Sequence, residues 1–317
     1  MMADRGGPAR RVLHVCYCCD DVDGPASAFV RGLGMREAMR TTGEPTSGAI
    51  LGMDREVQGV AAFVYDHRGP RVGAAIEVQS WISPGLEGQP FAEPNHIGVQ
   101  ALGFAVPDLK ASVAALDSFG ARVSGRGDSP LFRLPVATLA DGSGVALDLV
   151  ERSDVPDDRS RMHHVRITCS DLERSAAWYA GLGFEAVGAP EQVTDGATLG
   201  HSGLVDVVAQ RLRLPDEPME IVLTQWRNPA SFGRHYEEPN HAGWYRIALG
   251  VDDIREVYST MSAAGWTFDR APMLVSLDGT NVPDMWITFT TDPDGVPFEL
   301  VQRPRDAFAE PVTSLHA

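Results

Sequence analysis

The sequence predicts an α+β fold built from four β-α-β-β-β units, and two observations carry this prediction. First, four segments follow one plan: an alternating strand, an aspartate, a short helix and a closing glycine. Second, the tetrapeptide Glu-Pro-Asn-His occurs at 93–96 and again at 238–241, a spacing of 238 − 93 = 145 residues, close to half of the 317-residue chain. We therefore expect two similar halves, each containing two units.

The aspartate and the glycine that bound each predicted helix have physical roles. An aspartate carboxylate accepts hydrogen bonds from the free amides of a first helical turn, and glycine tolerates the left-handed conformation that ends a helix. The four strand–helix segments are HVCYCCDDVDGPASAFVRGLG, ALGFAVPDLKASVAALDSFG, HVRITCSDLERSAAWYAGLG and RIALGVDDIREVYSTMSAAG. Each unit is expected to end in an apolar strand: GAAIEVQSW, GVALDLVER, MEIVLTQW and GVPFELVQR.

A polar stretch at 153–161, SDVPDDRSR, has the composition of a linker. We place the boundary between two tandem domains there, at 1–155 and 156–317. The first domain contains units at about 11–84 and 97–152, and the second contains units at about 163–229 and 242–304. The repeated Pro-Asn-His is interpreted as a joint between successive units, because Asn side chains commonly bond within their own turns.

Composition narrows the function classes. The formal net charge of −16, from 27 basic and 43 acidic residues, argues against nucleic acid as a partner. No apolar run is long enough to span a bilayer, and the N-terminal residues lack the apolar core of a signal peptide, which favours a cytoplasmic protein without a membrane partner. The partner that we expect is therefore a small-molecule substrate or ligand, and a homodimer is a candidate assembly.

The paired units, together with HHVRITCSDLERSAAWYAGLGF and DPDGVPFELVQRP, resemble the vicinal oxygen chelate superfamily of glyoxalases, bleomycin-resistance proteins and extradiol dioxygenases. The resemblance covers roughly residues 11–304. It implies that units pair into curled, open mixed sheets, each around a cavity. The fold carries many chemistries, so it does not define the reaction.

The resemblance also implies where ligand positions lie: on the first strand of a unit, seven residues before the capping aspartate, and on the last strand. These positions hold His14 and Glu77 in unit one, Ala101 and Asp148 in unit two, His164 and Val222 in unit three, and Arg246 and Glu299 in unit four. Because side chains alternate along a strand, Cys16 and Cys18 share a face with His14, and Arg166 and Thr168 share a face with His164. These four residues are candidates for substrate binding.

Two pairings of the units follow from the sequence. If units one and two pair, His14, Glu77 and Asp148 form a site for Fe, Mn, Ni or Zn, and no metal is expected in the second half. There, Glu299, His164 and Arg246 would be the catalytic groups. A guanidinium has no lone pair to donate, so Arg246 either takes the metal's place and bonds Glu299 or binds an anionic ligand group.

If unit one instead pairs with unit four, His14 and Glu77 face Arg246 and Glu299. Unit two then meets unit three, which brings Asp148 to His164. The sequence leaves both arrangements open.

The functional hypothesis is a small-molecule enzyme with metal-assisted isomerase, lyase or oxygenase chemistry on an oxygenated substrate. The alternatives are a metal-free binding protein of the drug-sequestering type, and a metal-free enzyme that uses Glu299 beside Arg246. The resemblance argues against ring cleavage, because the ring-cleaving relatives carry a tyrosine at the position of Phe289.

Overall fold

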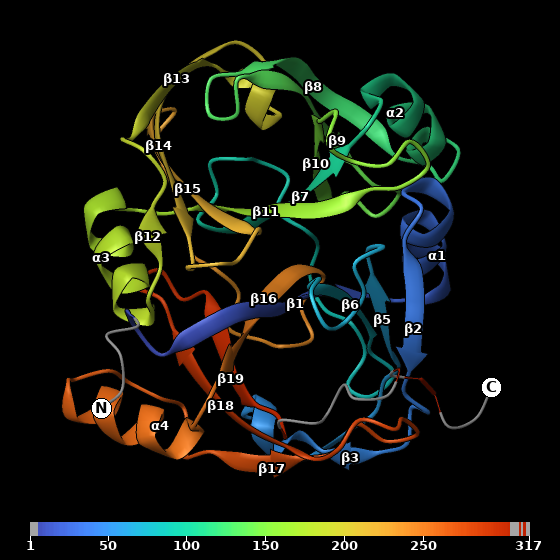
Figure 1. Cartoon of the computed structure of the whole chain (residues 1–317), viewed down its shortest axis with the longest axis vertical. Helices are drawn as coiled ribbons and strands as arrows, with labels where there is room; N and C mark the ends of the chain where they lie inside the picture. Colours follow the sequence, from blue (N-terminus) through green and yellow to red (C-terminus); the bar gives the residue numbers. More distant parts are fainter. Residues whose placement is uncertain (1–5, 305–310, 312, 315–317) are drawn as a thin grey trace.

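The computed structural model describes residues 6–304, 311, 313 and 314. It contains the four predicted units, whose strands form two large mixed sheets, one above the other in Figure 1. The predicted α+β class with curled mixed sheets is confirmed. Within the described residues, no helix is both long enough and apolar enough to cross a membrane.

Units one and four form an eight-stranded sheet in the order β17-β18-β19-β16-β1-β6-β5-β2. Strands β1 and β16 pair antiparallel at the centre, and the last strand of each unit, β6 or β19, lies parallel to its first strand. Unit one contains β1 (Ala9–Cys19), α1 (Asp23–Ser27), β2 (Arg36–Arg40), β3 (Thr46–Ser47), β4 (Glu56–Val57), β5 (Ala61–Tyr65) and β6 (Ala75–Ser80). Unit four contains β16 (Gly243–Val251), α4 (Ile254–Ala263), β17 (Met273–Val275), β18 (Met285–Thr291) and β19 (Pro297–Gln302).

Units two and three form the other large sheet, in the order β12-β14-β15-β11-β7-β10-β9-β8, with β13 paired to β14. Its centre is the antiparallel pair β7 and β11. Unit two contains β7 (Gly98–Val106), α2 (Leu109–Asp117), β8 (Arg122–Ser129), β9 (Leu134–Ala140) and β10 (Ala146–Glu151). Unit three contains β11 (Arg161–Thr168), α3 (Leu172–Leu182), β12 (Glu185–Ala186), β13 (Glu191–Asp195), β14 (Leu204–Arg213) and β15 (Glu220–Asn228).

The structure therefore shows the second of the two pairings that the sequence left open. Each sheet takes one unit from each half of the chain, so the halves 1–155 and 156–317 are interlocked. The boundary near residue 155 stays a prediction about the chain, since the sheets do not follow it.

The capping residues act as the sequence predicts. Asp108, Asp171 and Asp253 each accept a backbone N–H in the first turn of their helix, and Gly183 ends α3 with φ 106°. In unit one, Asp21 accepts from the amides of Asp23 and Gly24, and α1 continues as a π-helical turn. Figure 1 shows the helices at the periphery of the two sheets.

The largest hydrophobic core lies on the face of each sheet opposite to the one that carries the ligand positions. Strand β6 illustrates this alternation, because Ile76 and Val78 belong to the core, whereas Glu77 and Gln79 point to the other face. Strand β16 does the same, with Ile247 in the core. Side chains on the cavity faces of the two sheets form separate, smaller clusters.

The sequence predicted that the repeated Glu-Pro-Asn-His segments join successive units within each half; in the structure their asparagines bond across the two halves instead. Asn95 Nδ2 donates to the carbonyl of Ala230, and Asn240 Nδ2 donates to the carbonyl of Gly85, both at 2.8 Å. The two donors, Asn95 and Asn240, are 145 residues apart, and so are the two acceptors, Gly85 and Ala230. Each segment thus bonds the loop that follows the last strand of a unit in the other half.

Four rings stack at this joint in the order His96, Phe91, Tyr236 and His241. Their centroids are 3.9, 4.2 and 3.8 Å apart, and successive rings are inclined by 20°, 22° and 12°. Phe91 and Tyr236 occupy corresponding positions of the two halves, so the central contact of the stack joins one half to the other.

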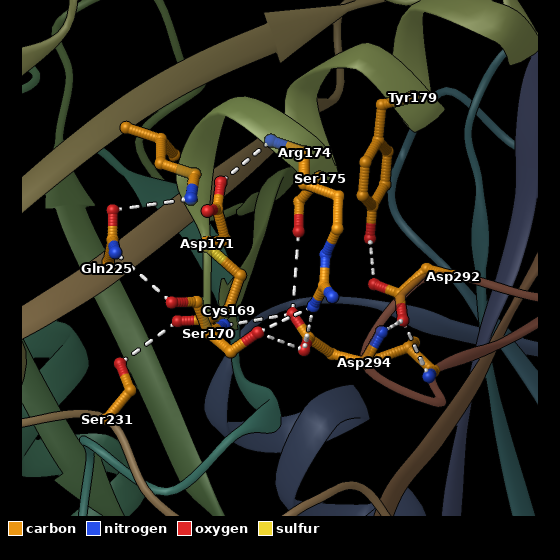
Figure 2. A network of polar contacts seen from close by, with 12 residues as sticks. Cys169, Ser170, Asp171, Arg174, Ser175, Tyr179, Gln225, Ser231, Asp292 and Asp294 are labelled. Atoms are coloured by element: carbon orange, nitrogen blue, oxygen red, sulfur yellow. Dashed lines mark hydrogen bonds and ion pairs between the residues drawn. The ribbon is translucent and has the colours of Figure 1, made fainter.

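The Asp-Pro-Asp-Gly turn between β18 and β19 is a second link between the sheets (Figure 2). Asp294 accepts from the backbone N–H and hydroxyl of Ser170 and pairs with Arg174 at 3.0 Å, so it bonds the start of α3 in the other sheet. Asp292 accepts from the hydroxyl of Tyr179 at 3.1 Å. The turn therefore has a structural role.

Candidate functional site

The cavity face of the eight-stranded sheet brings together the four ligand positions of units one and four. His14 lies on β1, Glu77 on β6, Arg246 on β16 and Glu299 on β19, and all four strands are neighbours in the sheet. All four side chains are buried, with exposed fractions of 4–7%. Because burying charged groups is costly unless they are paired, their mutual contacts decide what the site can do.

The guanidinium of Arg246 lies between the two carboxylates. Its Nε donates to Glu299 at 2.8 Å, its Nη2 donates to both oxygens of Glu77 at 3.0 and 2.8 Å, and its Nη1 contacts Cys16 Sγ at 3.4 Å. His14 Nε2 lies 3.3 Å from Glu77 Oε2 and 3.3 Å from Glu299 Oε2. The expected Arg246–Glu299 bond is present, and Glu77 is a second partner.

This arrangement keeps Glu299 and Arg246 ionised. Burial acts to raise the pKa of Glu299, but the charges of His14 and Arg246 and their hydrogen bonds lower that pKa to about 2. Burial acts to lower the pKa of Arg246, whereas Cys16, Glu77 and Glu299 together raise it well above its usual range. Arg246 is therefore a permanent cation at the centre of the site.

A divalent metal does not fit this donor set. The carboxylate oxygens nearest to His14, Glu77 Oε2 and Glu299 Oε2, already accept hydrogen bonds from Arg246. A metal ion there would compete for the same lone pairs beside a buried positive charge that has no donor to offer. Among the described residues, no group of three or more His, Cys, Asp or Glu side chains is arranged to hold a metal.

A two-lobed cavity opens beside Arg246 and Glu77. The outer lobe, about 160 Å³, has polar and exposed residues at its rim, including Glu44, Ser47 and Asp278. The inner lobe, about 120 Å³, has mainly apolar walls. Both lobes are lined by Ile50, Leu51, Glu77, Arg246, Val275 and Leu277, so they adjoin each other.

The apolar wall of the inner lobe comes from the outer strands of the sheet. Phe63 lies on β5, and Met285, Ile287 and Phe289 lie on β18. His14 and Glu299 also line this lobe, and Nδ1 of His14 is buried without a hydrogen-bond partner. In the sequence, Phe289 stands out only because the ring-cleaving relatives carry a tyrosine there. The period-two alternation of β18 is the signal that could have placed its side chain on the cavity face.

The predicted set of His14, Glu77 and Asp148 does not form one site. Asp148 lies on β10 in the other sheet, because unit two pairs with unit three and not with unit one. There Arg166 donates to Asp148 through Nε at 2.8 Å and Nη2 at 3.1 Å, His164 Nε2 lies at 3.3 Å, and Thr138 donates at 2.8 Å. The proposed three-residue metal site is therefore wrong as a geometric unit.

This second centre is enclosed. His164, Arg166 and Asp148 are exposed by only 1%, 2% and 6%, and Val222 occupies the remaining ligand position of unit three. Burial acts to raise the pKa of Asp148, but Arg166 and His164 lower it well below its usual range. His164 is thus separated from Arg246 and Glu299, with which it was grouped as a catalytic residue.

The four predicted substrate-binding residues line neither lobe of the cavity. Cys16 contacts Arg246, and Cys18 Sγ lies 3.4 Å from the carbonyl of Pro239 in the joint. Thr168 donates to the carbonyl of Pro94 at 2.8 Å, and Arg166 pairs with Asp148. The strand alternation predicts correctly which residues of β1 and β11 share a face. These four side chains contact other parts of the protein instead of the cavity.

Comparison with known proteins supports the class that this fold defines. Residues 161–300 match the family model described as the Glyoxalase/Bleomycin resistance protein/Dioxygenase superfamily. The chain is similar in structure to glyoxalase I from Zea mays, with 19% identity, a TM-score of 0.66 and 92% of each chain covered. It is also similar to a putative dioxygenase from Bacillus subtilis, with 14% identity, a TM-score of 0.62, and 94% of this chain and 86% of the other covered. No curated protein sequence matches the chain significantly.

These similarities agree with the resemblance seen in the sequence: residues 161–300 match the superfamily model, and the chain as a whole shares the fold of these neighbours. At 14–19% identity, the structural neighbours establish the fold and no particular reaction.

Proposed function

We propose that the chain binds a small organic molecule in the two-lobed cavity of the eight-stranded sheet, and that it does so without a metal ion. The observation that carries the proposal is the position of Arg246, which holds both Glu77 and Glu299 at the place where relatives put a metal ligand. The protein itself thus supplies a cation that pairs with both buried acids.

The shape and chemistry of the cavity support a ligand with two parts. The outer lobe offers hydroxyl, amide and carboxylate groups near solvent, and the inner lobe offers aromatic and aliphatic walls. Ligand sites in proteins commonly combine an apolar lining with a few polar groups that orient the ligand. Of the functions considered from the sequence, metal-free ligand binding agrees best with this arrangement.

A metal-free enzyme is the second candidate, and one observation favours it. His14 lines the inner lobe, and its Nδ1 is buried without a hydrogen-bond partner, so an imidazole with one unused nitrogen lies beside the place of a bound ligand. Glu299 is a weaker candidate for the base than the sequence indicated, because its pKa of about 2 makes it a poor proton acceptor at neutral pH. In this reading Arg246 positions the two acids, and His14 moves the proton.

Metal-assisted chemistry is not proposed for this site. It requires the lone pairs of Glu77 and Glu299 that Arg246 occupies, and it requires a divalent ion to lie beside a guanidinium. The structural neighbours named glyoxalase I and putative dioxygenase share the fold at low identity, so their chemistry does not transfer to these residues.

The neutral, environment-sensitive dye Nile red tests ligand binding in the cavity. We expect saturable binding to the full chain, measured by dye fluorescence, that is unchanged after dialysis against EDTA. Ala61→Phe, which adds a ring to the wall of the outer lobe, should weaken binding, whereas Val72→Ala, at an exposed apolar side chain outside the cavity, should not. Loss of binding on chelation, or equal binding by Ala61→Phe, contradicts the proposal.

Turnover separates the two candidates. Compounds that displace Nile red would be incubated with the wild-type protein and with His14→Ala, and the mixtures analysed by liquid chromatography and mass spectrometry. Product formation by the wild type that His14→Ala abolishes, with retained binding, establishes the enzyme. Displacement without product supports a binding protein.

A further inference from the structure

We infer that the ligand of this cavity is neutral or cationic and carries hydrogen-bond donors, and that anionic compounds are excluded. This inference rests on the proposed function, because it names the chemical class of ligand for the same cavity. Three features of the lining carry it: the arginines already have partners, the rim is acidic, and the polar side chains of the wall present acceptors.

The arginines that line the cavity already have partners within the protein. Each nitrogen of the Arg246 guanidinium has one: Nε bonds Glu299, Nη2 bonds Glu77, and Nη1 contacts Cys16. Arg303, which lines the inner lobe, also interacts within the protein. To pair with Arg246, an anionic group would therefore have to displace Glu77 or Glu299, and breaking a buried pair is costly.

The rim of the outer lobe carries negative charge. Glu44 and Asp278 line this lobe and are exposed, while Glu77 lies at its base. Over both lobes, four carboxylates (Glu44, Glu77, Asp278 and Glu299) face two guanidinium groups (Arg246 and Arg303). The chain as a whole carries a formal charge of −16, so the long-range field also repels anions.

Two glutamines of the outer lobe add acceptors. Gln58 Nε2 donates to the carbonyl of Gly43 at 3.1 Å, and Gln79 Nε2 donates to the carbonyl of Ser80 at 2.7 Å. Both glutamines line the lobe, and their amide oxygens remain available to accept. A ligand amine, hydroxyl or amide N–H satisfies such acceptors, whereas a carboxylate or phosphate offers them no donor.

The inner lobe sets the other end of the ligand. Its walls of Phe63, Met285, Ile287 and Phe289 take an aromatic or aliphatic group, and His14 meets Phe63 edge to face at 5.8 Å. The ligand class is therefore an apolar or aromatic compound that carries amine or hydroxyl groups at one end.

Three dyes of different charge test this inference on the full chain: cationic proflavine, neutral Nile red and anionic 1-anilinonaphthalene-8-sulfonate. We expect saturable binding of the first two and at least about tenfold weaker binding of the anionic dye at low ionic strength, with a smaller difference at high salt because exposed charges are screened. The double variant Glu44→Lys/Asp278→Lys should weaken proflavine binding and strengthen binding of the anionic dye. Glu173→Lys/Glu185→Lys, at exposed acids of α3 and β12 in the other sheet, makes the same change of net charge and should have little effect.

The results distinguish a failure of ligand binding in the cavity from a failure of the inferred charge preference. If none of the dyes binds saturably, the proposed binding function itself fails. If the dyes bind but the anionic dye binds as tightly as proflavine, or both double variants change the preference equally, the cavity exists and the inference about ligand charge is overturned.

Discussion

Nη2 of Arg246 donates to both carboxylate oxygens of Glu77, at 3.0 and 2.8 Å, across the boundary between unit four and unit one. The same guanidinium bonds Glu299 within unit four. One side chain therefore joins the two units at the centre of their shared sheet, at a position where the family resemblance implies a metal ligand. The stability of the sheet and the chemistry of its cavity depend on the same residue.

Replacing Arg246 with a neutral side chain that can act as a metal ligand should create a metal site. Arg246→Gln removes the buried cation and supplies an amide oxygen beside His14, Glu77 and Glu299, which together are ligands that Zn²⁺ or Mn²⁺ accepts. We expect about one metal ion per chain in the variant after dialysis, and substoichiometric metal in the wild type, by elemental analysis. Arg166→Gln is the control, because only His164 and Asp148 converge there. A stoichiometric metal in the wild type contradicts the interpretation of Arg246.

Removing the cation without replacing it should destabilise the protein. Arg246→Met removes the guanidinium that bonds both buried carboxylates, and breaking a buried pair in this way costs about 3–5 kcal/mol. Urea unfolding at pH 7 measures the loss. The triple variant Glu77→Gln/Arg246→Met/Glu299→Gln removes the uncompensated charges and should recover much of the stability. A single variant as stable as the wild type means that the carboxylates do not need Arg246.

The stability that Glu299 contributes should depend on pH in a defined direction. Its pKa is lowered from 4.5 in the unfolded chain to about 2 in the fold, so the contribution is fully present above pH 4.5 and is lost as the pH falls toward 2. We expect the difference in unfolding free energy between the wild type and Glu299→Gln to be constant from pH 7 to 5 and to shrink below that. A difference that stays constant down to pH 3 would show that the pKa is not lowered.

The local features of the fold could be predicted because they depend on residues near one another in the chain. Asp108, Asp171 and Asp253 cap their helices through amides only two or three residues away, and the strand alternation places His14 and Glu77 on the cavity face. The pairing of the units could not be predicted in this way. Strands β1 and β16 meet through residues more than two hundred positions apart, and β7 or β11 offers a similar apolar alternation to the same partner.

In the candidate site, too, contacts within one unit could be predicted and contacts between units could not. The identity of Arg246 and its bond to Glu299 could be expected from residue types within one unit, whereas its bond to Glu77 depends on which unit lies beside it. The separation of Asp148 from His14 has the same cause. The strand alternation could have placed Phe63 and Phe289 on the cavity face, but an apolar side chain there carries no further signal that separates a ligand-binding wall from packed core.

The stacked rings at the joint offer a direct measure of how strongly the two halves are coupled. Phe91 and Tyr236 stack with centroids 4.2 Å apart, and each also stacks on a histidine of the repeated tetrapeptide. We expect Phe91→Ala and Tyr236→Ala each to destabilise the protein by about 2–4 kcal/mol, because each removes a large ring from a packed contact. The double variant should lose less than the sum by about 0.5–1.5 kcal/mol, the usual coupling of an aromatic pair. Urea unfolding of the wild type, the two single variants and the double variant gives this coupling. Phe232→Ala is the control for a general loss of packing, because Phe232 is a half-exposed ring beside His96 but outside the central pair. Strict additivity of the two changes would mean that the central contact carries no coupling, and that the hydrogen bonds across the joint hold the two halves together without it.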